Sequence, residues 1–121
     1  MKIIVFGANG RTGQEVIEQA ISSGIEVTAF VRNTDNIKVK SDKLSIVVGQ
    51  ATRYEDVKNA MEGHDVVISC IGGNGSKVST TITDITKNIV DAMNETEVKR
   101  IAQVASAGVH GELKGIMGKI V

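Results

Sequence analysis

Three glycines recur at every third position near the start of the chain, in the stretch FGANGRTGQ at residues 6–14. Gly7, Gly10 and Gly13 directly follow an apolar run at residues 3–6. Glycine permits the positive φ angles and close backbone approach that a sharp turn from a strand into a helix requires. The first turn of such a helix offers free N–H groups and the positive end of the helix dipole, which together attract a phosphate. The spacing therefore indicates a pyrophosphate site.

This spacing differs from the usual dinucleotide fingerprint G-x-G-x-x-G, because Asn9 occupies the position of the second glycine. A glycine-rich turn without a ligand is the alternative, but the flanking strand and helix patterns favour the phosphate site. Arg11 could pair with a phosphate or remain solvated, and Thr12 could cap the helix or bind the phosphate. Gly13 is expected to let the helix pack close to the strand in either case.

A second chemical feature is Arg32, at the end of the second predicted strand. A protein that binds NAD places an acidic residue there to hold the ribose hydroxyls, whereas a guanidinium can pair with the 2′-phosphate of NADP. Arg32 therefore favours NADP over NAD. The alternatives are that Arg32 is an ordinary surface residue and that Asp35 weakens phosphate binding.

The elements that must position these residues alternate between short β-branched runs and helical periods. Strands are predicted at residues 2–6, 26–31, 44–48, 65–70 and 100–105, and helices at 14–23, 52 to about 61, and 80–94. Continuously apolar strands that alternate with helices indicate a parallel sheet covered on both faces. We predict one Rossmann-type domain over residues 1–121, a three-layer αβα sandwich with strand order 3-2-1-4-5.

Local signals refine the helix ends and faces. Gly24 and Gly63 are predicted to end the first two helices, and Thr52 with Glu55 to begin the second through a capping box. The predicted apolar stripe of the third helix consists of Ile82, Ile85, Ile89, Val90 and Met93.

The composition excludes several classes of protein. Fourteen basic residues balance fourteen acidic ones among 121, which argues against general binding to nucleic acid or anionic membranes. The chain has no signal-peptide pattern and no apolar run near the length of roughly 20 residues that spans a bilayer. Its single cysteine, Cys70, fits a reducing cytoplasm. We therefore expect a cytoplasmic protein.

The chain resembles the atypical short-chain dehydrogenase/reductases, in particular the NmrA-like and biliverdin/flavin-reductase-like NAD(P)H-binding proteins. The resemblance covers nearly the whole sequence and rests most specifically on FGANGRTGQ and VKRIAQVASAGV, and further on VTAFVRN, TTITDITKNIVDAM and the segment from VVGQATRYED to DVVISCIGG.

The resemblance implies roles for individual residues. The expected pyrophosphate contacts are Gly7, Asn9, Gly10, Arg11, Thr12 and Gly13. Arg32 would meet the 2′-phosphate, and Gln50, which replaces the usual aspartate after the third strand, would lie at the adenine. Cys70, Ile71 and Gly72 would flank the ribose and nicotinamide. Ser106 would lie near the nicotinamide as the catalytic residue.

Two features depart from the family pattern. Many short-chain reductases carry a Tyr-x-x-x-Lys pair beyond the serine, but here that spacing occurs at Tyr54 and Lys58, in the wrong context. Family members are also longer, and their C-terminal half supplies the substrate pocket. We therefore expect this chain to correspond to a cofactor-binding half without the substrate half.

Other reactive side chains have simpler interpretations. His64 precedes the fourth strand, at the edge opposite the expected ligand site, and is predicted to be a surface residue. His110 lies at the ligand edge, where an exposed loop histidine is the favoured interpretation over one near the substrate. Cys70 is expected to be a buried apolar residue. Two histidines and one cysteine predict no metal site.

Two functions remain open from the sequence. One is an NADPH-dependent reductase of small carbonyl, quinone or flavin-like substrates. The other is a non-catalytic regulator that senses NADP. A homodimer through the C-terminal region is also predicted, because the final apolar stripe at residues 113–121 lacks a partner.

Overall fold

Short runs of β-branched residues form a parallel sheet in the computed structural model, which describes residues 1–8, 11–34, 37, 40–70, 80–98 and 100–103. The strands are β1 (Lys2–Phe6), β2 (Glu26–Val31), β3 (Leu44–Val48), β4 (Val66–Ser69) and β5 (Arg100–Gln103). Their order is β3-β2-β1-β4-β5 and every neighbouring pair is parallel. The predicted strand order is confirmed.

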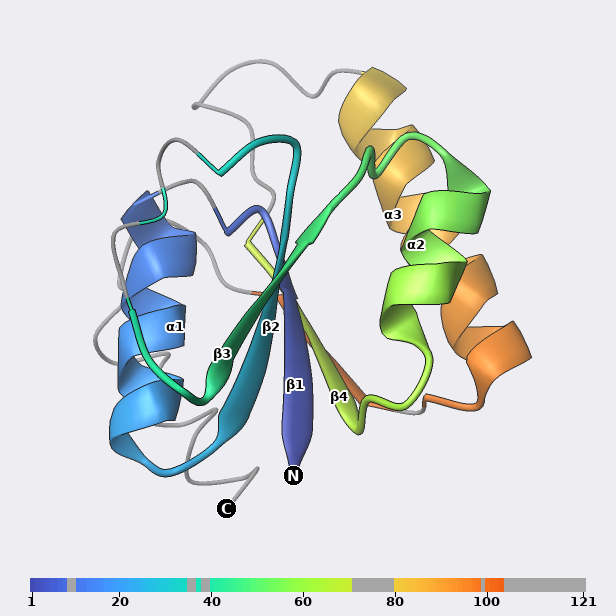
Figure 1. The fold of residues 1–121 in the computed structure, drawn as a ribbon. Coiled ribbons are helices and arrows are strands. Elements are labelled where there is room, and N and C mark those ends of the chain that lie inside the picture. The colour runs from blue at the N-terminus through green and yellow to red at the C-terminus, as the bar shows by residue number, and fades with distance from the viewer. Residues whose placement is uncertain (9–10, 35–36, 38–39, 71–79, 99, 104–121) are drawn as a thin grey trace.

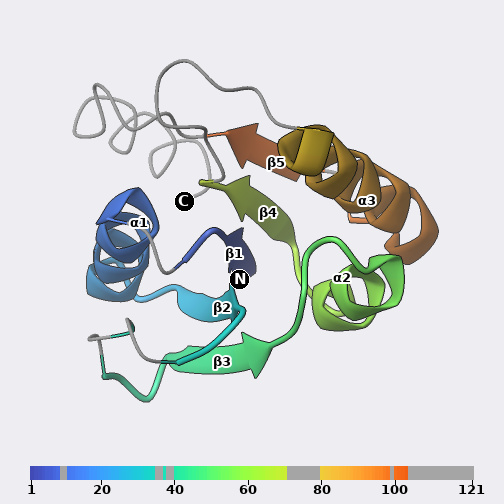
Figure 2. The same ribbon diagram turned by 90° about the horizontal axis from the view of Figure 1, so that it is seen from above.

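Helices cover the two faces of this sheet unequally (Figures 1 and 2). Helix α1 (Arg11–Ser22) lies on one face, and α2 (Tyr54–Met61) and α3 (Thr80–Thr96) lie side by side on the other. The predicted three-layer αβα sandwich is confirmed.

The alternation of side chains along each strand divides the core into two clusters. On β1, Ile3 and Val5 pack toward α1, whereas Ile4 and Phe6 pack toward α2 and α3. The Phe6 ring meets the Phe30 ring of β2 with their centroids 4.9 Å apart. Both faces of the central strand are therefore buried, which explains why β1 is continuously apolar.

Glycines end two of the helices, as predicted. Gly24 follows α1 with a φ of +79°, and Gly63 follows α2 with a φ of +84°. Both residues adopt the left-handed conformation that glycine accepts without a steric penalty.

The predicted capping box at Thr52 and Glu55 is wrong. The N-cap of α2 is Arg53, and no side chain makes a capping hydrogen bond there. A different acidic residue is used instead, because the Asp56 carboxylate accepts the N–H of Gln50 at 3.0 Å. The loop after β3 is thus held by Asp56, the neighbour of the glutamate that the pattern assigned to the helix start.

The predicted apolar stripe of α3 also needs one correction. Ile89 and Met93 are buried as expected, but Val90 is 46% exposed and the unpredicted Ala92 is fully buried. Position 92 follows position 89 by three residues and so shares its helical face, whereas position 90 turns away.

The predicted stripe at residues 113–121 and the predicted strand end at residues 104–105 lie outside the described residues. Within the described part of the chain, no helix is long and apolar enough to cross a membrane.

Candidate dinucleotide-binding site

The turn between β1 and α1 begins at Gly7, whose φ is +79°. Ala8 follows and is completely buried. A side chain at position 7 would be strained in this left-handed conformation. The first glycine of the motif is therefore required by the backbone itself.

Gly13 allows α1 to approach that turn closely. A Cβ atom at position 13 would collide with the Gly7 carbonyl oxygen and lie 2.7 Å from the Ala8 Cα. All of these opposing atoms belong to the backbone, so they cannot swing aside as a flexible side chain could. The predicted role of Gly13 in close packing is confirmed, although it packs against the turn after β1 and not along the strand.

The N-terminus of α1 is thereby held at the carboxyl end of β1, in the middle of the sheet (Figure 1). The first N–H groups of a helix have no partner within the helix and carry the positive end of its dipole. This arrangement suits a phosphate. Asn9 and Gly10, and the side chains of Arg11 and Thr12, lie outside the described residues.

Arg32 lies at the same edge of the sheet, directly after β2. Phe6 pairs with Phe30 across the two strands, so Gly7 and Arg32 both leave the sheet at its carboxyl edge. The Arg32 side chain is exposed. The structure therefore places a guanidinium beside the strand that carries the glycine turn.

The third strand contributes Gly49 and Gln50 to this edge. The Gly49 N–H donates to the carbonyl of Val31 at 2.9 Å. A Cβ at position 49 would lie 3.0 Å from the Phe30 ring, so the backbone passes directly against that ring. Gln50 is exposed, and its N–H is held by Asp56. Sequence reasoning missed this anchor, although the acidic residues in the first turn of α2 were a visible signal.

Cys70 completes the described part of the edge at the end of β4. Its N–H donates to the Phe6 carbonyl at 2.9 Å, and its side chain packs against the core on the α1 side. Burial raises the pKa of the Cys70 thiol to about 12. Cys70 was predicted to be buried as an apolar residue; it does pack against the core, but it is only partly buried. Ile71, Gly72, Ser106 and His110 lie outside the described residues.

The raised pKa of Cys70 predicts slow alkylation of the native protein. The neutral thiol predominates from pH 7 to pH 10, because the thiolate, the reactive form, becomes abundant only near pH 12. Iodoacetamide should therefore modify the native chain far more slowly at pH 8 than the urea-unfolded chain, as mass spectrometry would measure. Equal rates in the two states would contradict the burial of this thiol.

His64 lies at the opposite edge of the sheet and is not a simple surface residue. Its side chain is half-buried. Its Nδ1 is 3.1 Å from the Met61 carbonyl oxygen, and its Nε2 is 2.8 Å from the Thr28 hydroxyl. A carbonyl only accepts, so Nδ1 is the protonated nitrogen. His64 ties the end of α2 to β2, which the sequence position alone did not indicate.

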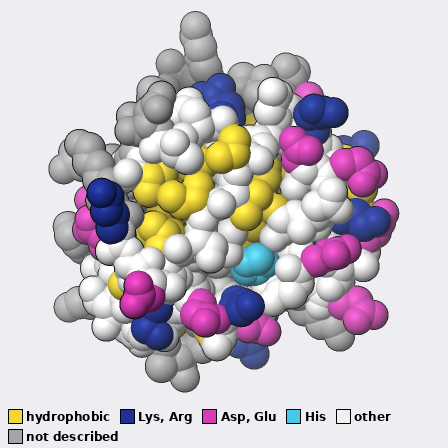
Figure 3. All heavy atoms as spheres, viewed as in Figure 1, with side chains coloured by type: hydrophobic (Ala, Val, Ile, Leu, Met, Phe, Trp, Pro, Cys, Tyr) yellow, Lys and Arg dark blue, Asp and Glu magenta, His cyan; other side chains and the backbone are white. Residues whose placement is uncertain are grey.

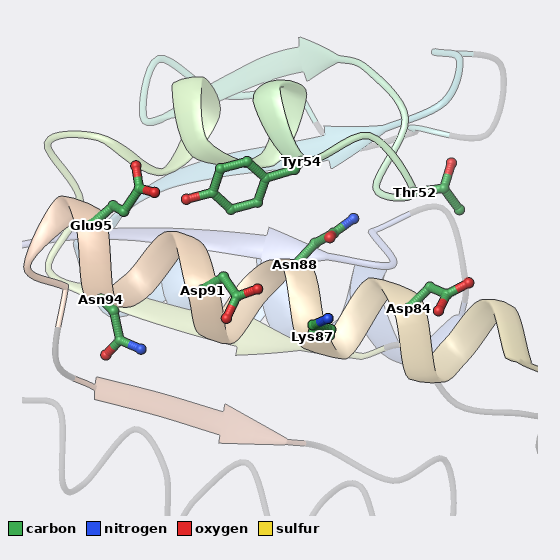
Figure 4. Close-up of a pocket in the computed structure, with 8 residues that line it drawn as sticks. All are labelled: Thr52, Tyr54, Asp84, Lys87, Asn88, Asp91, Asn94 and Glu95. Atoms are coloured by element: carbon green, nitrogen blue, oxygen red, sulfur yellow. The ribbon is translucent and has the colours of Figure 1, made fainter.

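Tyr54 faces α3 from α2 (Figure 4), and Lys58 of the same helix contacts Glu95 of α3. The Lys58 ammonium pairs with the Glu95 carboxylate at 3.0 Å, which raises the pKa of Lys58 and lowers that of Glu95. The Tyr54 hydroxyl is buried without a hydrogen-bond partner of acceptable geometry among the described residues. Its burial raises the Tyr54 pKa, and the nearby Glu95 raises it further. The ion pair of Lys58 with Glu95 therefore joins α2 to α3 on the face of the sheet opposite α1.

Metal ligands do not gather in the described residues, where no three His, Cys, Asp or Glu side chains could share an ion. What the carboxyl edge offers is a glycine turn, a helix N-terminus and a guanidinium.

Comparison with known proteins agrees with a dinucleotide site at this edge. The sequence pattern of the NAD(P)H-binding family matches residues 7–120. This chain belongs to the NAD(P)H-binding family. Its fold is also that of solved Rossmann-type proteins, among them a Rossmann-fold NAD(P)-binding family protein of Shigella flexneri that is 21% identical.

Three of the proteins to which this chain is similar cover sequence and fold. An uncharacterised chloroplast protein of Arabidopsis thaliana is 32% identical over 94% of this chain and 44% of its own length. A putative epimerase of Bacteroides thetaiotaomicron is 26% identical, with a TM-score of 0.73 over 84% of this chain and 45% of its own. A short-chain dehydrogenase/reductase of Veillonella parvula in complex with NADP is 19% identical, with a TM-score of 0.72 over 91% of this chain and 49% of its own. This chain therefore spans less than half the length of each.

Proposed function

We propose that this chain binds NADP(H) and forms the cofactor-binding part of an NADPH-dependent reductase. One observation carries the proposal, namely the backbone contact of Gly13 with Gly7 and Ala8. That contact presents the N-terminus of α1 at the carboxyl edge of the sheet, the edge at which open α/β sheets bind their ligands.

The proposed cofactor contacts extend from this turn. Backbone N–H groups of Asn9, Gly10, Arg11 and Thr12 would donate to the pyrophosphate, because the first turn of a helix leaves its N–H groups free. Gln50 would meet the adenine, and Cys70, Ile71 and Gly72 would border the ribose and nicotinamide.

The preference for NADP over NAD rests on Arg32. Its exposed guanidinium follows β2, where it can donate two parallel hydrogen bonds to a 2′-phosphate.

The bound nicotinamide would supply the hydride, and this chain would mainly hold and orient it. We assign Ser106 the role of a hydrogen-bond donor near the site of transfer. Small carbonyl, quinone or flavin-like compounds are the proposed substrate class, in an NmrA-like or biliverdin/flavin-reductase-like protein.

We place the protein in the cytoplasm on the basis of its single cysteine. The homodimer predicted through the C-terminal region stays a prediction, since it concerns residues 104–121.

Oxidation of NADPH in the presence of a panel of quinones, flavins and small carbonyl compounds tests the reductase proposal. We expect turnover with at least one acceptor, a fall of about 10²-fold in kcat with Ser106→Ala, as for the loss of a transition-state donor, and no change with Tyr54→Phe. The second variant is the matched control, because the Tyr54 hydroxyl faces α3. NADPH binding without turnover on any acceptor would instead support a non-catalytic NADP-sensing regulator.

A further inference from the structure

The outer edge of β3 carries an apolar patch that charged side chains surround. Ile46 is 42% exposed and Val48 is 60% exposed. Figure 3 shows hydrophobic side chains gathered at the centre of this face, with acidic and basic side chains toward its rim. An apolar centre with a polar rim is the usual anatomy of a protein interface.

Among the described residues, no strand pairs with the backbone of β3 on this side. In the described residues β3 pairs with β2 alone. The Lys43 carbonyl accepts from Val27 at 2.8 Å, and the Gly49 N–H donates to Val31 at 2.9 Å. Since peptide groups along a strand alternate between its two edges, the odd-numbered residues of β3 face β2.

The even-numbered residues Leu44, Ile46 and Val48 therefore direct their N–H and C=O groups outward. The Leu44 N–H already bonds to the Ser41 carbonyl at 3.1 Å, whereas both polar groups of Ile46 and Val48 face the open edge. Leu44 packs against the core on the α1 side and Val47 against the opposite core. Because side chains alternate between the two faces of a strand, the side chains of Leu44, Ile46 and Val48 all lie on the α1 face of the sheet.

This strand lacks the features that usually protect an edge. The sequence LSIVV contains no charge and no proline, and edge strands normally carry such residues to prevent pairing. Helix α1 lies over β1 and β2 (Figure 2), which leaves Ile46 and Val48 on the uncovered margin of the sheet.

The pattern of this edge is complementary to itself. In an antiparallel pair related by a two-fold axis at Ile46, Leu44 would face Val48 of a second copy and Ile46 would face Ile46. In this register each of Leu44, Ile46 and Val48 faces one of the same three residues in the second copy. A shift of the register by two residues in either direction leaves at least one of them without an apolar partner. The six apolar side chains would form one continuous strip.

Charge also permits this register. Beyond the strand, Lys43 would face Gly49 and Asp42 would face Gln50. Like charges directly opposite each other destabilise a strand pair. Neither of these two pairs brings like charges together.

We propose that β3 is a homodimer interface, through which two copies pair antiparallel about Ile46 into one continuous ten-stranded sheet. The occupant is a second copy of this chain because the edge matches itself in hydrogen bonding, side-chain face and charge. The short paired edge buries less surface than a standard stable interface, so the dimer should be weak and concentration-dependent.

Sedimentation velocity over a range of concentrations tests the proposal on the full chain. We expect reversible dimerisation, weakened at least tenfold by Val48→Lys and by Ile46→Pro, which removes an outward N–H without touching the bonds to β2. Val90→Lys is the matched control, since it places the same charge at an exposed valine on α3, and it should leave the dimer unchanged. Amide exchange of Ile46 should also slow as the concentration rises.

Three results would overturn this interface. The first is a monomer at every concentration. The second is a dimer that persists in folded Val48→Lys, and the third is an Ile46 amide whose exchange does not depend on concentration. A dimer that Ile116→Lys dissolves while Val48→Lys leaves it intact would assign the contact to the C-terminal region instead.

Discussion

Replacing Gly13 with alanine is expected to destabilise the fold by about 2–3 kcal/mol, the upper part of the range for overpacking a tight site. The added Cβ would collide with the carbonyl oxygen of Gly7 and approach the Ala8 Cα. These backbone atoms cannot move unless α1 shifts away from β1. That shift would displace the N-terminus of α1, so NADP binding should be lost together with stability. Urea denaturation and NADPH fluorescence titration measure the two effects.

Gly24→Ala is the matched control for this substitution. Gly24 has a φ of +79°, but no atom lies within 4 Å of a Cβ at this position. Its only penalty is left-handed backbone strain of about 1–2 kcal/mol. NADP binding should survive this change, because Gly24 follows the far end of α1. If Gly13→Ala bound NADP as well as Gly24→Ala does, the close approach of α1 to the turn would not matter for the cofactor.

Arg32→Ala is expected to weaken NADP binding by about 10- to 100-fold while leaving NAD binding unchanged. The loss corresponds to about 1.5–3 kcal/mol, the usual contribution of a hydrogen bond to a charged group. NAD lacks the 2′-phosphate and so should not sense the guanidinium. NADPH fluorescence titration at a fixed salt concentration measures the change.

Arg100→Ala provides the control for net charge. Arg100 is also exposed, but it begins β5 at the opposite edge of the sheet. Equal losses of NADP affinity in the two variants would indicate a general electrostatic effect and remove the basis for a preference for NADP.

The fold was predictable from the sequence because its determinants are local and repeated. Apolar β-branched runs at β1, β2 and β4 could only be strands buried on both faces, and the bounds of β1, β2 and β3 agree with the prediction. Helix ends followed from Gly24 and Gly63. The start of α2 was not predictable, because the Asp56 carboxylate serves the N–H of Gln50 across the loop. Propensity rules do not describe that contact.

The candidate site was predictable only in part. The glycine spacing indicated a tight turn, and the packing of Gly13 confirms it. The involvement of His64 with Thr28, 36 residues earlier in the chain, required the topology, since the sheet brings the end of α2 beside β2. The pairing of Lys58 with Glu95 likewise required knowing that α2 lies beside α3. The spacing of Tyr54 and Lys58 matches a catalytic pair, but its sequence context already argued against that role, and the fold uses the lysine to join two helices.

Isothermal titration of the 121-residue chain with NADP, and in parallel with NAD, tests most directly whether the glycine turn holds a dinucleotide. We predict saturable binding of NADP at one site per chain, with NAD bound at least tenfold more weakly and NADP binding lost in Gly13→Ala. Negligible heat and no binding for both dinucleotides, with the protein folded by circular dichroism, would contradict the assignment of this turn as a cofactor site.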